Sequence, residues 1–365
     1  MSQDKKKLLV FHSIIAPYRV DFFNRLASQF QMVMHVDRGK TDDSLFSDVE
    51  RECHFTYSEF ASSDGLLSIL RYVVKAIHDC GPETVLVSEC GLVSLIVVLY
   101  KKLFRKRYRI ISMIDDSYDM LAGDNQFSHR HAMAEKILIP QFDEIINVEP
   151  RVADYFKKKY GKGVCFPIIR DEARYRRELE ASLGMARSYM DQYDLEGKKV
   201  ILFVGRFVAL KNVAALIQVV QSVEDDSIRL VLVGAGPEEV SYKGIVNTGK
   251  VIFAGKKTGQ ALYAWYNVAQ ILVLPSVREA FGAVVNEALM SGCKCLVSER
   301  AGSSCLIREG HNGYCVNPVV VQDIREKLLV LLRQVDDACD LDTIKPSLML
   351  ITFEDEFKKV VDIIQ

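Results

Sequence analysis

Short runs of apolar residues alternate with amphipathic stretches along this whole chain, and that alternation limits the fold more than any other feature. Stretches such as residues 18–30, 66–78, 212–223 and 281–290 carry apolar side chains at helical spacing. Strands rich in Val, Ile and Leu that alternate with helices predict parallel sheets covered by helices on both faces. The expected strands are residues 7–12, 32–36, 84–88, 109–113 and 144–148 in the first half, and 199–205, 229–234, 251–255, 270–275 and 294–298 in the second.

The chain of 365 residues is long enough for two cores of ordinary size, and each half holds one strand–helix block. The sequence therefore predicts two doubly wound α/β domains. The first is expected over residues 1–168 and the second over 199–350, with a charged helical connector at 169–198. Residues 351–365 are expected to form a C-terminal helix that packs back on the first domain.

Composition excludes several classes of protein. The formal net charge is −1, whereas a protein that binds nucleic acid usually carries a basic excess. The nine cysteines are odd in number and scattered, which favours reduced thiols, and the Cys293–Cys295 pair lacks further zinc ligands nearby. A polar start and the lack of about 18 consecutive apolar residues predict neither a secretion signal nor a spanning helix. We therefore expect a cytoplasmic protein without a metal.

The first chemically suggestive residues follow the first strand of the second block. Gly205, Arg206 and Lys211 stand where that strand ends and the next helix begins. Ligands of open α/β sheets bind at the carboxyl ends of strands, and helix N-termini there favour anions. An arginine fork and a lysine point charge at that place are suited to a diphosphate. Taken alone, the two cations are equally consistent with a solvated turn.

The strongest signal is the segment that holds Glu279 and Glu287. The two glutamates have seven residues between them, a span of roughly 12 Å if the segment is helical throughout. Phe281, Gly282 and Ala283 are expected at the start of that helix, where free N–H groups can meet phosphate oxygens. Two solvent-exposed glutamates are the alternative, but Glu287 lies among apolar neighbours, which disfavours it.

These residues and their flanks resemble a known family. Residues 274–276 (LPS) precede the two glutamates and 288–292 (ALMSG) follow them, while 233–237 (VGAGP) and 310–314 (GHNGY) fall in matching order and approximate spacing. The pattern is similar to that of family 4 retaining glycosyltransferases of the GT-B fold, within the glycosyl transferases group 1. It covers residues 199–333 closely and the first half loosely. The resemblance implies two Rossmann-like domains that face a central cleft.

The resemblance also implies an activity, namely the transfer of a hexose from a UDP- or GDP-sugar to a glycan or lipid-linked acceptor. Such enzymes serve surface polysaccharide or glycoconjugate biosynthesis, retain anomeric configuration, and need no metal or other cofactor beyond the nucleotide sugar. The implied site residues are Gly205, Arg206 and Lys211 for the diphosphate, Glu279 for the transferred sugar, Phe281, Gly282 and Ala283 for backbone contacts, Glu287 for the ribose, and Gly255 and Lys256 beside the nucleobase.

The first block departs from the family pattern, because residues 12–19 (HSIIAPYR) lack its glycine-rich loop. Tyr18 and Arg19 are candidates for the acceptor side, or ordinary residues of a first helical turn. Asp116 follows an expected strand, where relatives place a histidine or an acid near the acceptor. It is a candidate catalytic base, although a helix-capping or turn aspartate explains it as well.

Other functions remain as alternatives. The Gly234–Gly236 pair resembles half of a dinucleotide fingerprint, but Glu239 replaces the third glycine, which counts against NAD. A nucleotide-sugar epimerase, a phosphorylase or a non-catalytic nucleotide-sugar-binding partner shares the fold class. His129 and His131 suggest a metal only weakly, since no third ligand is suitably spaced.

An apolar stretch at 91–103 runs into the basic segment Lys101–Arg109, and a second basic run covers 157–162. A helix buried in its own domain, with a solvated basic end, accounts for the first of them. The alternative is a peripheral contact of Lys101–Arg109 with anionic lipid on the inner face of a membrane, which suits a lipid-linked acceptor.

Overall fold

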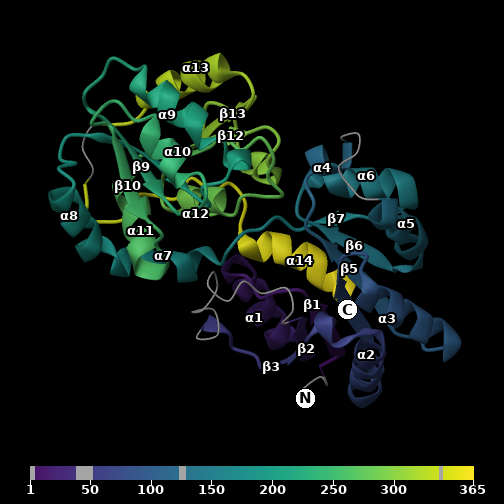
Figure 1. Ribbon diagram of the computed structural model, residues 1–365. Helices are drawn as coiled ribbons and strands as arrows, with labels where there is room; N and C mark the ends of the chain where they lie inside the picture. Colours follow the sequence, from purple (N-terminus) through teal and green to yellow (C-terminus); the bar gives the residue numbers. More distant parts are fainter. Residues whose placement is uncertain (1–4, 38–51, 123–128, 337–339) are drawn as a thin grey trace. The chain divides into compact units, whose positions relative to one another are not determined.

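A computed structural model describes residues 5–37, 52–122, 129–336 and 340–365 (Figure 1). The chain divides into two compact units. Unit 1 comprises residues 1–170 and 353–365, and unit 2 comprises residues 171–352. Each unit contains one parallel sheet covered by helices, as the alternation of apolar runs and amphipathic stretches predicts.

The sheet of unit 1 has seven strands in the order β3-β2-β1-β4-β5-β6-β7. Its central strands are buried on both faces, which explains their continuous apolar sequence. The strands are β1 (Lys7–His12), β2 (Gln31–Asp37), β3 (Tyr57–Phe60), β4 (Thr84–Ser88), β5 (Arg109–Ile114), β6 (Glu144–Asn147) and β7 (Val164–Cys165); the helices are α1 (Val20–Gln29), α2 (Leu66–Cys80), α3 (Leu92–Leu103), α4 (Tyr118–Ala122), α5 (His129–Leu138), α6 (Pro150–Tyr160) and α14 (Phe353–Ile364).

The sheet of unit 2 has six strands in the order β10-β9-β8-β11-β12-β13. A core of Val, Ile, Leu and Phe side chains joins β8 and β9 to the helices α9 and α13. The strands are β8 (Lys199–Val204), β9 (Ile228–Val233), β10 (Val251–Gly255), β11 (Ile271–Leu274), β12 (Lys294–Ser298) and β13 (Gly313–Val316); the helices are α7 (Glu172–Ala181), α8 (Leu183–Gln192), α9 (Val213–Gln221), α10 (Glu239–Gly244), α11 (Gly259–Val268), α12 (Val284–Met290) and α13 (Val321–Leu332).

The expected connector belongs to unit 2 and the C-terminal helix belongs to unit 1. Residues 171–198 form α7 and α8, which pack against α11 inside unit 2. The C-terminal helix α14 belongs to unit 1, where Phe353 and Phe357 contact Phe166 and Phe22. Its last carbonyls accept hydrogen bonds from Thr84 and other unit 1 side chains. Because α14 follows unit 2 in sequence, the chain crosses between the units twice.

Candidate functional site

The carboxyl edge of the unit 2 sheet is organised around β8 and β11, which are neighbours in the sheet. From β8 the chain continues to β9 on one side, whereas β11 continues to β12 on the other. This reversal of strand order is a topological switch point, the place where open α/β sheets bind ligands. Lys211 follows β8 and Glu279 follows β11, so the switch point brings residues 68 positions apart to one place.

Lys211 and Glu279 form an ion pair through Nζ and Oε2. Both side chains are largely buried, with 18% and 13% of their surface exposed. Ser276 Oγ lies 3.3 Å from the same carboxylate oxygen, and the Val277 N–H donates to the Leu210 carbonyl at 2.9 Å. A lysine ammonium has three N–H donors, so Lys211 can hold Glu279 and still offer donors to an anion. The pair thus places a cation and a carboxylate side by side at the edge.

The glycines of this edge are required by close approach of two backbone loops. A Cβ on Gly234 would lie 1.9 Å from the Gly205 carbonyl oxygen, and one on Gly236 would lie 2.4 Å from the carbonyl oxygen of Phe207. The Gly205 N–H also donates to the carbonyl of Val233 at the end of β9 at 3.0 Å, and the Phe207 N–H donates to the Ala235 carbonyl in the following loop at 2.9 Å. The Gly-x-Gly that weakly suggested a dinucleotide therefore has a structural purpose, which is to hold the Arg206 loop against the end of β9.

The loop after Glu279 differs from the prediction. Helix α12 begins at Val284, so the segment from Glu279 to Ala283 is not helical and the expected start at Phe281 is wrong. Gly282 has φ +91, and a Cβ there would lie 2.4 Å from Leu274 Cδ2. The Phe281 carbonyl accepts from the Ser303 N–H at 2.9 Å, which ties the loop to a neighbouring turn. The backbone of 281–283 is thus set by packing and by a left-handed glycine.

Glu287 lies in α12 and is oriented by a buried tyrosine. The Tyr266 hydroxyl donates to Glu287 Oε2 at 2.9 Å. Burial first, and the nearby Glu287 second, raise the pKa of Tyr266 well above its ordinary value, so the phenol remains a donor. Sequence reasoning missed Tyr266, because an aromatic residue on the apolar side of a helix gives no sign of a polar contact.

The other residues that are predicted to bind the donor nucleotide sugar lie at the same sheet. Arg206 is exposed on the loop after β8, and Lys256 is exposed after β10. Gly255 adopts φ +71, and its carbonyl accepts from the Gly234 N–H at 3.0 Å. Lys211 and Glu279 are in direct contact. Arg206 lies in the loop that leads to Lys211, and Glu287 lies in helix α12, which follows Glu279 in the sequence.

At the carboxyl edge of the unit 1 sheet, Arg19 and Asp115 form an ion pair with Nη2 and Oδ1 2.5 Å apart. Arg19 is 2% exposed and Asp115 is 33% exposed, so a buried guanidinium supports a carboxylate that solvent reaches. Two further guanidinium nitrogens of Arg19, Nε and Nη1, are buried and donate no hydrogen bond to the residues that the structure describes. Tyr18 and Asp116 are both half-buried beside the pair. The sequence analysis singled out Asp116, whereas the ion pair with Arg19 is formed by its neighbour Asp115.

A metal site is not evident in the parts of the chain that the structure describes. Those residues contain no group of three or more His, Cys, Asp or Glu placed to bind a metal ion. The side chains of His129 and His131 lie outside the described residues. The cysteines of the described part are free thiols. Among the described helices, none is both long and apolar enough to cross a bilayer.

Comparison with known sequences supports the assignment of the second unit. Residues 187–342 match the family described as glycosyl transferases group 1. An uncharacterized glycosyltransferase of Methanocaldococcus jannaschii is 34% identical over 145 residues, which cover 38% of this chain and 36% of that protein. A GDP-mannose-dependent alpha-mannosyltransferase of Mycobacterium tuberculosis is 26% identical over 51% of this chain and 45% of its own length. The chain thus matches less than half the length of these curated relatives.

Solved structures resemble the whole chain. A glycosyltransferase from Rickettsia africae superposes with a TM-score of 0.75 and 12% identity, covering 99% of this chain and 98% of that one. HepE of Anabaena, solved in complex with UDP, gives a TM-score of 0.74 and 14% identity, covering 98% and 99%. At such identities the likeness establishes the fold, which is the predicted GT-B architecture of two Rossmann-like units.

Proposed function

We propose that this protein transfers a hexose from a UDP- or GDP-sugar to an acceptor hydroxyl, since residues 187–342 match the glycosyl transferases group 1 family. The observation that carries the proposal is the Lys211–Glu279 pair at the switch point of unit 2. A cation there suits a diphosphate, and a carboxylate beside it suits the hydroxyls of the attached sugar.

The catalytic proposal assigns roles to this chain's own residues. Lys211 and Arg206 stabilise the charge that develops on the leaving diphosphate, and the backbone of 281–283 supplies N–H groups next to it. Glu279 positions the transferred sugar, and Glu287, held by Tyr266, binds the ribose. We propose transfer with retention and without a metal, in which the leaving phosphate accepts the acceptor's proton. Such a front-face reaction depends on positioning and preorganised charge more than on a strong base.

Names of similar proteins support both donor types. HepE of Anabaena was solved with UDP-glucose, and the mycobacterial relative is named for GDP-mannose. The test is a panel of UDP-glucose, UDP-galactose, UDP-N-acetylglucosamine and GDP-mannose, scored by thermal shift and by slow release of the nucleoside diphosphate. We expect one nucleotide class to raise the melting temperature and to be hydrolysed. If none of the four does either, the proposed function is wrong.

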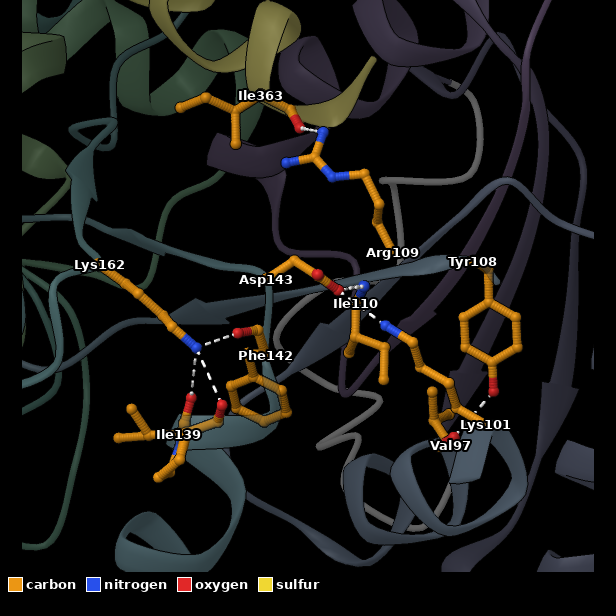
Figure 2. Close-up of polar contacts among 11 residues, drawn as sticks. Val97, Lys101, Tyr108, Arg109, Ile110, Ile139, Phe142, Asp143, Lys162 and Ile363 are labelled. Atoms are coloured by element: carbon orange, nitrogen blue, oxygen red, sulfur yellow. Dashed lines mark hydrogen bonds and ion pairs between the residues drawn. The ribbon is translucent and has the colours of Figure 1, made fainter. Parts of the chain in front are cut away.

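We also propose a peripheral contact with anionic lipid, as part of a role in surface polysaccharide or glycoconjugate synthesis on the cytoplasmic side. Within the basic segment, Figure 2 shows that two cations have internal partners: Lys101 contacts Asp143 at 3.0 Å, and Arg109 donates to the Ile363 carbonyl at 2.5 Å. The segment's exposed cations are Lys102, Arg105, Lys106 and Arg107, and they flank the exposed Leu103 and Phe104. Cations beside exposed apolar side chains are typical of interfacial binding.

Flotation with phosphatidylglycerol and phosphatidylcholine vesicles tests this contact. We expect binding to the anionic vesicles alone, weakened by high salt and by the double change Lys106→Glu and Arg107→Glu. The matched control is Lys157→Glu with Lys158→Glu, on the exposed side of α6. Equal loss in both variants would argue for a general effect of charge, and no flotation of the wild type would remove the contact.

A further inference from the structure

A cavity of about 120 Å³ lies at the carboxyl edge of the unit 1 sheet. Its lining includes the last residues of four adjacent strands, which are Phe60 of β3, Asp37 of β2, His12 of β1 and Ser88 of β4. Strand β1 pairs with β2 on one side and with β4 on the other, so the cavity spans the switch point of this sheet. It therefore occupies the position in unit 1 that the Lys211–Glu279 pair occupies in unit 2.

The described lining favours an uncharged group over a nucleotide or a phosphate. Asp37 is the one charged residue among those that line the cavity in the described part of the chain, and no Lys or Arg accompanies it. Phe11 and Phe60 meet edge to face with ring centroids 6.4 Å apart. Ile69 of α2 and Leu92 of α3 complete an apolar wall. An anion in the cavity would be repelled by the Asp37 carboxylate and by the aromatic faces, whereas an uncharged apolar group would make favourable contacts with the apolar wall.

The size of the cavity limits the occupant. An engineered apolar cavity of about 150 Å³ holds one benzene molecule, so this slightly smaller one fits a single ring or a short branched chain. Both helices that contribute to the lining also carry exposed leucines. Leu92 itself is 40% exposed, and Leu66, Leu67 and Leu70 are 62%, 68% and 40% exposed in the first turns of α2, the helix that supplies Ile69. An exposed apolar side chain that lines a cavity, as Leu92 does, is typical of a binding surface.

We propose that this cavity binds an uncharged, ring-sized apolar group of the acceptor, so that the acceptor is an apolar alcohol or a glycoside of one. The inference rests on the proposed transferase function, because it assigns the second substrate of that reaction. It distinguishes an apolar acceptor from a purely polar glycan, because the polar residues among the described part of the lining are His12, Ser13, Asp37 and Ser88.

Binding of two matched probes tests the proposal on the full chain without donor. Phenyl β-glucoside and methyl β-glucoside differ only in the apolar group, and ligand-observed NMR measures their dissociation constants. We expect the phenyl compound to bind at least about tenfold more tightly, from burial of its ring. Leu92→Trp, which fills the mouth of the cavity, should abolish the difference.

Leu99→Trp is the control, because Leu99 lies in the same helix with a similar exposure of 46% and does not line the cavity. It should leave both constants within about twofold of wild type. Leu92→Ser, which removes the apolar wall without adding bulk, decides the matter if the tryptophan variant does not fold. Equal binding of the two probes, or a phenyl preference that survives both Leu92 variants, would overturn the proposal.

A parallel titration with UDP and GDP separates this inference from the proposed function. If the wild type binds a nucleotide but shows no preference for the phenyl compound, the proposed apolar acceptor is wrong and the proposed transferase function is unaffected. A wild type that binds phenyl β-glucoside and neither nucleotide would contradict the transferase function instead.

Discussion

The two sheets differ at the switch points of their carboxyl edges. In unit 2 this place holds the Lys211–Glu279 ion pair and two loops that glycines allow to approach closely. In unit 1 it holds a cavity with an apolar wall. Both sheets are parallel and share the strand–helix alternation, so topology alone does not set this contrast. The contrast is set by the side chains at the ends of the strands and in the loops that follow them. We propose that the charged edge binds the nucleotide sugar and that the cavity binds an apolar group of the acceptor, the two substrates of a transfer reaction.

The largest effect is expected at the charged edge. Glu279→Gln keeps the shape of the side chain but removes the charge that pairs with Lys211. We expect turnover of the preferred nucleotide sugar to fall at least about 100-fold, in the range seen when one preorganised polar group is lost from an active site. The measurement is the initial rate of nucleotide release. Glu239→Gln is the control, since Glu239 pairs with Lys243 in α10 and should leave the rate unchanged.

The next effect tests whether backbone contact builds the charged edge. Gly234→Ala would force a methyl group to within 1.9 Å of the Gly205 carbonyl oxygen. We expect unit 2 to lose at least ~2 kcal/mol of unfolding free energy. The single tryptophan, Trp265, is buried in this unit, so its fluorescence reports that unfolding.

Gly244→Ala is the matched control for this change, because a Cβ at Gly244 meets nothing within 4 Å. Its unfolding free energy should stay within about 0.5 kcal/mol of wild type. Equal destabilisation by the two substitutions would mean that the close approach of the two loops does not decide the effect.

A smaller effect tests how the ribose is recognised. Tyr266→Phe removes the hydroxyl that orients Glu287. We expect UDP or GDP to bind about fivefold more weakly, as for the loss of one hydrogen bond. The preference for the ribonucleotide over its 2′-deoxy form should shrink as well. Calorimetry measures both. Tyr108→Phe, which removes a buried hydroxyl of unit 1 that donates to Val97, should change neither quantity.

The smallest expected effect is a dependence of the stability of unit 1 on pH. Burial lowers the pKa of His35, which stacks on Phe11 beside the cavity, from its ordinary 6.5. The unfolded chain therefore binds the proton more readily, so this contribution to stability is complete above pH 6.5 and is lost as pH falls through the lowered pKa. The far-UV melting midpoint of the wild type should decrease on acidification, and His35→Gln should reduce that dependence. Replacement of the exposed His78 should not.

Sequence patterns were enough to predict the two parallel sheets, because buried strands need continuous apolar runs. They missed β3, β7 and β13, which are short and only partly buried. The start of α12 was misplaced because nothing local reveals that Gly282 must adopt φ +91 beneath Leu274. The motif that includes Lys211 and Glu279 was readable in sequence, but their contact across 68 residues was not.

The residues that position others were harder to find. Asp115 and Asp116 are identical in type and adjacent, so the sequence alone does not reveal that Asp115 pairs with Arg19. Tyr266 has the sequence pattern of an ordinary core residue, and so do Phe11 and Phe60, which line the cavity of unit 1. Long-range partners of this kind depend on which strands become neighbours, and the order of strands in a sheet is not written in local composition.

Titration of UDP and GDP into the wild type and into Lys211→Ala tests whether Lys211 binds the diphosphate of the donor. We expect one nucleotide to bind the wild type with a clear heat signal, and removal of the lysine to weaken this binding at least about tenfold while Trp265 fluorescence reports an intact unit 2. Equal binding by the two proteins, or no binding of either nucleotide to the wild type, would contradict this role of Lys211.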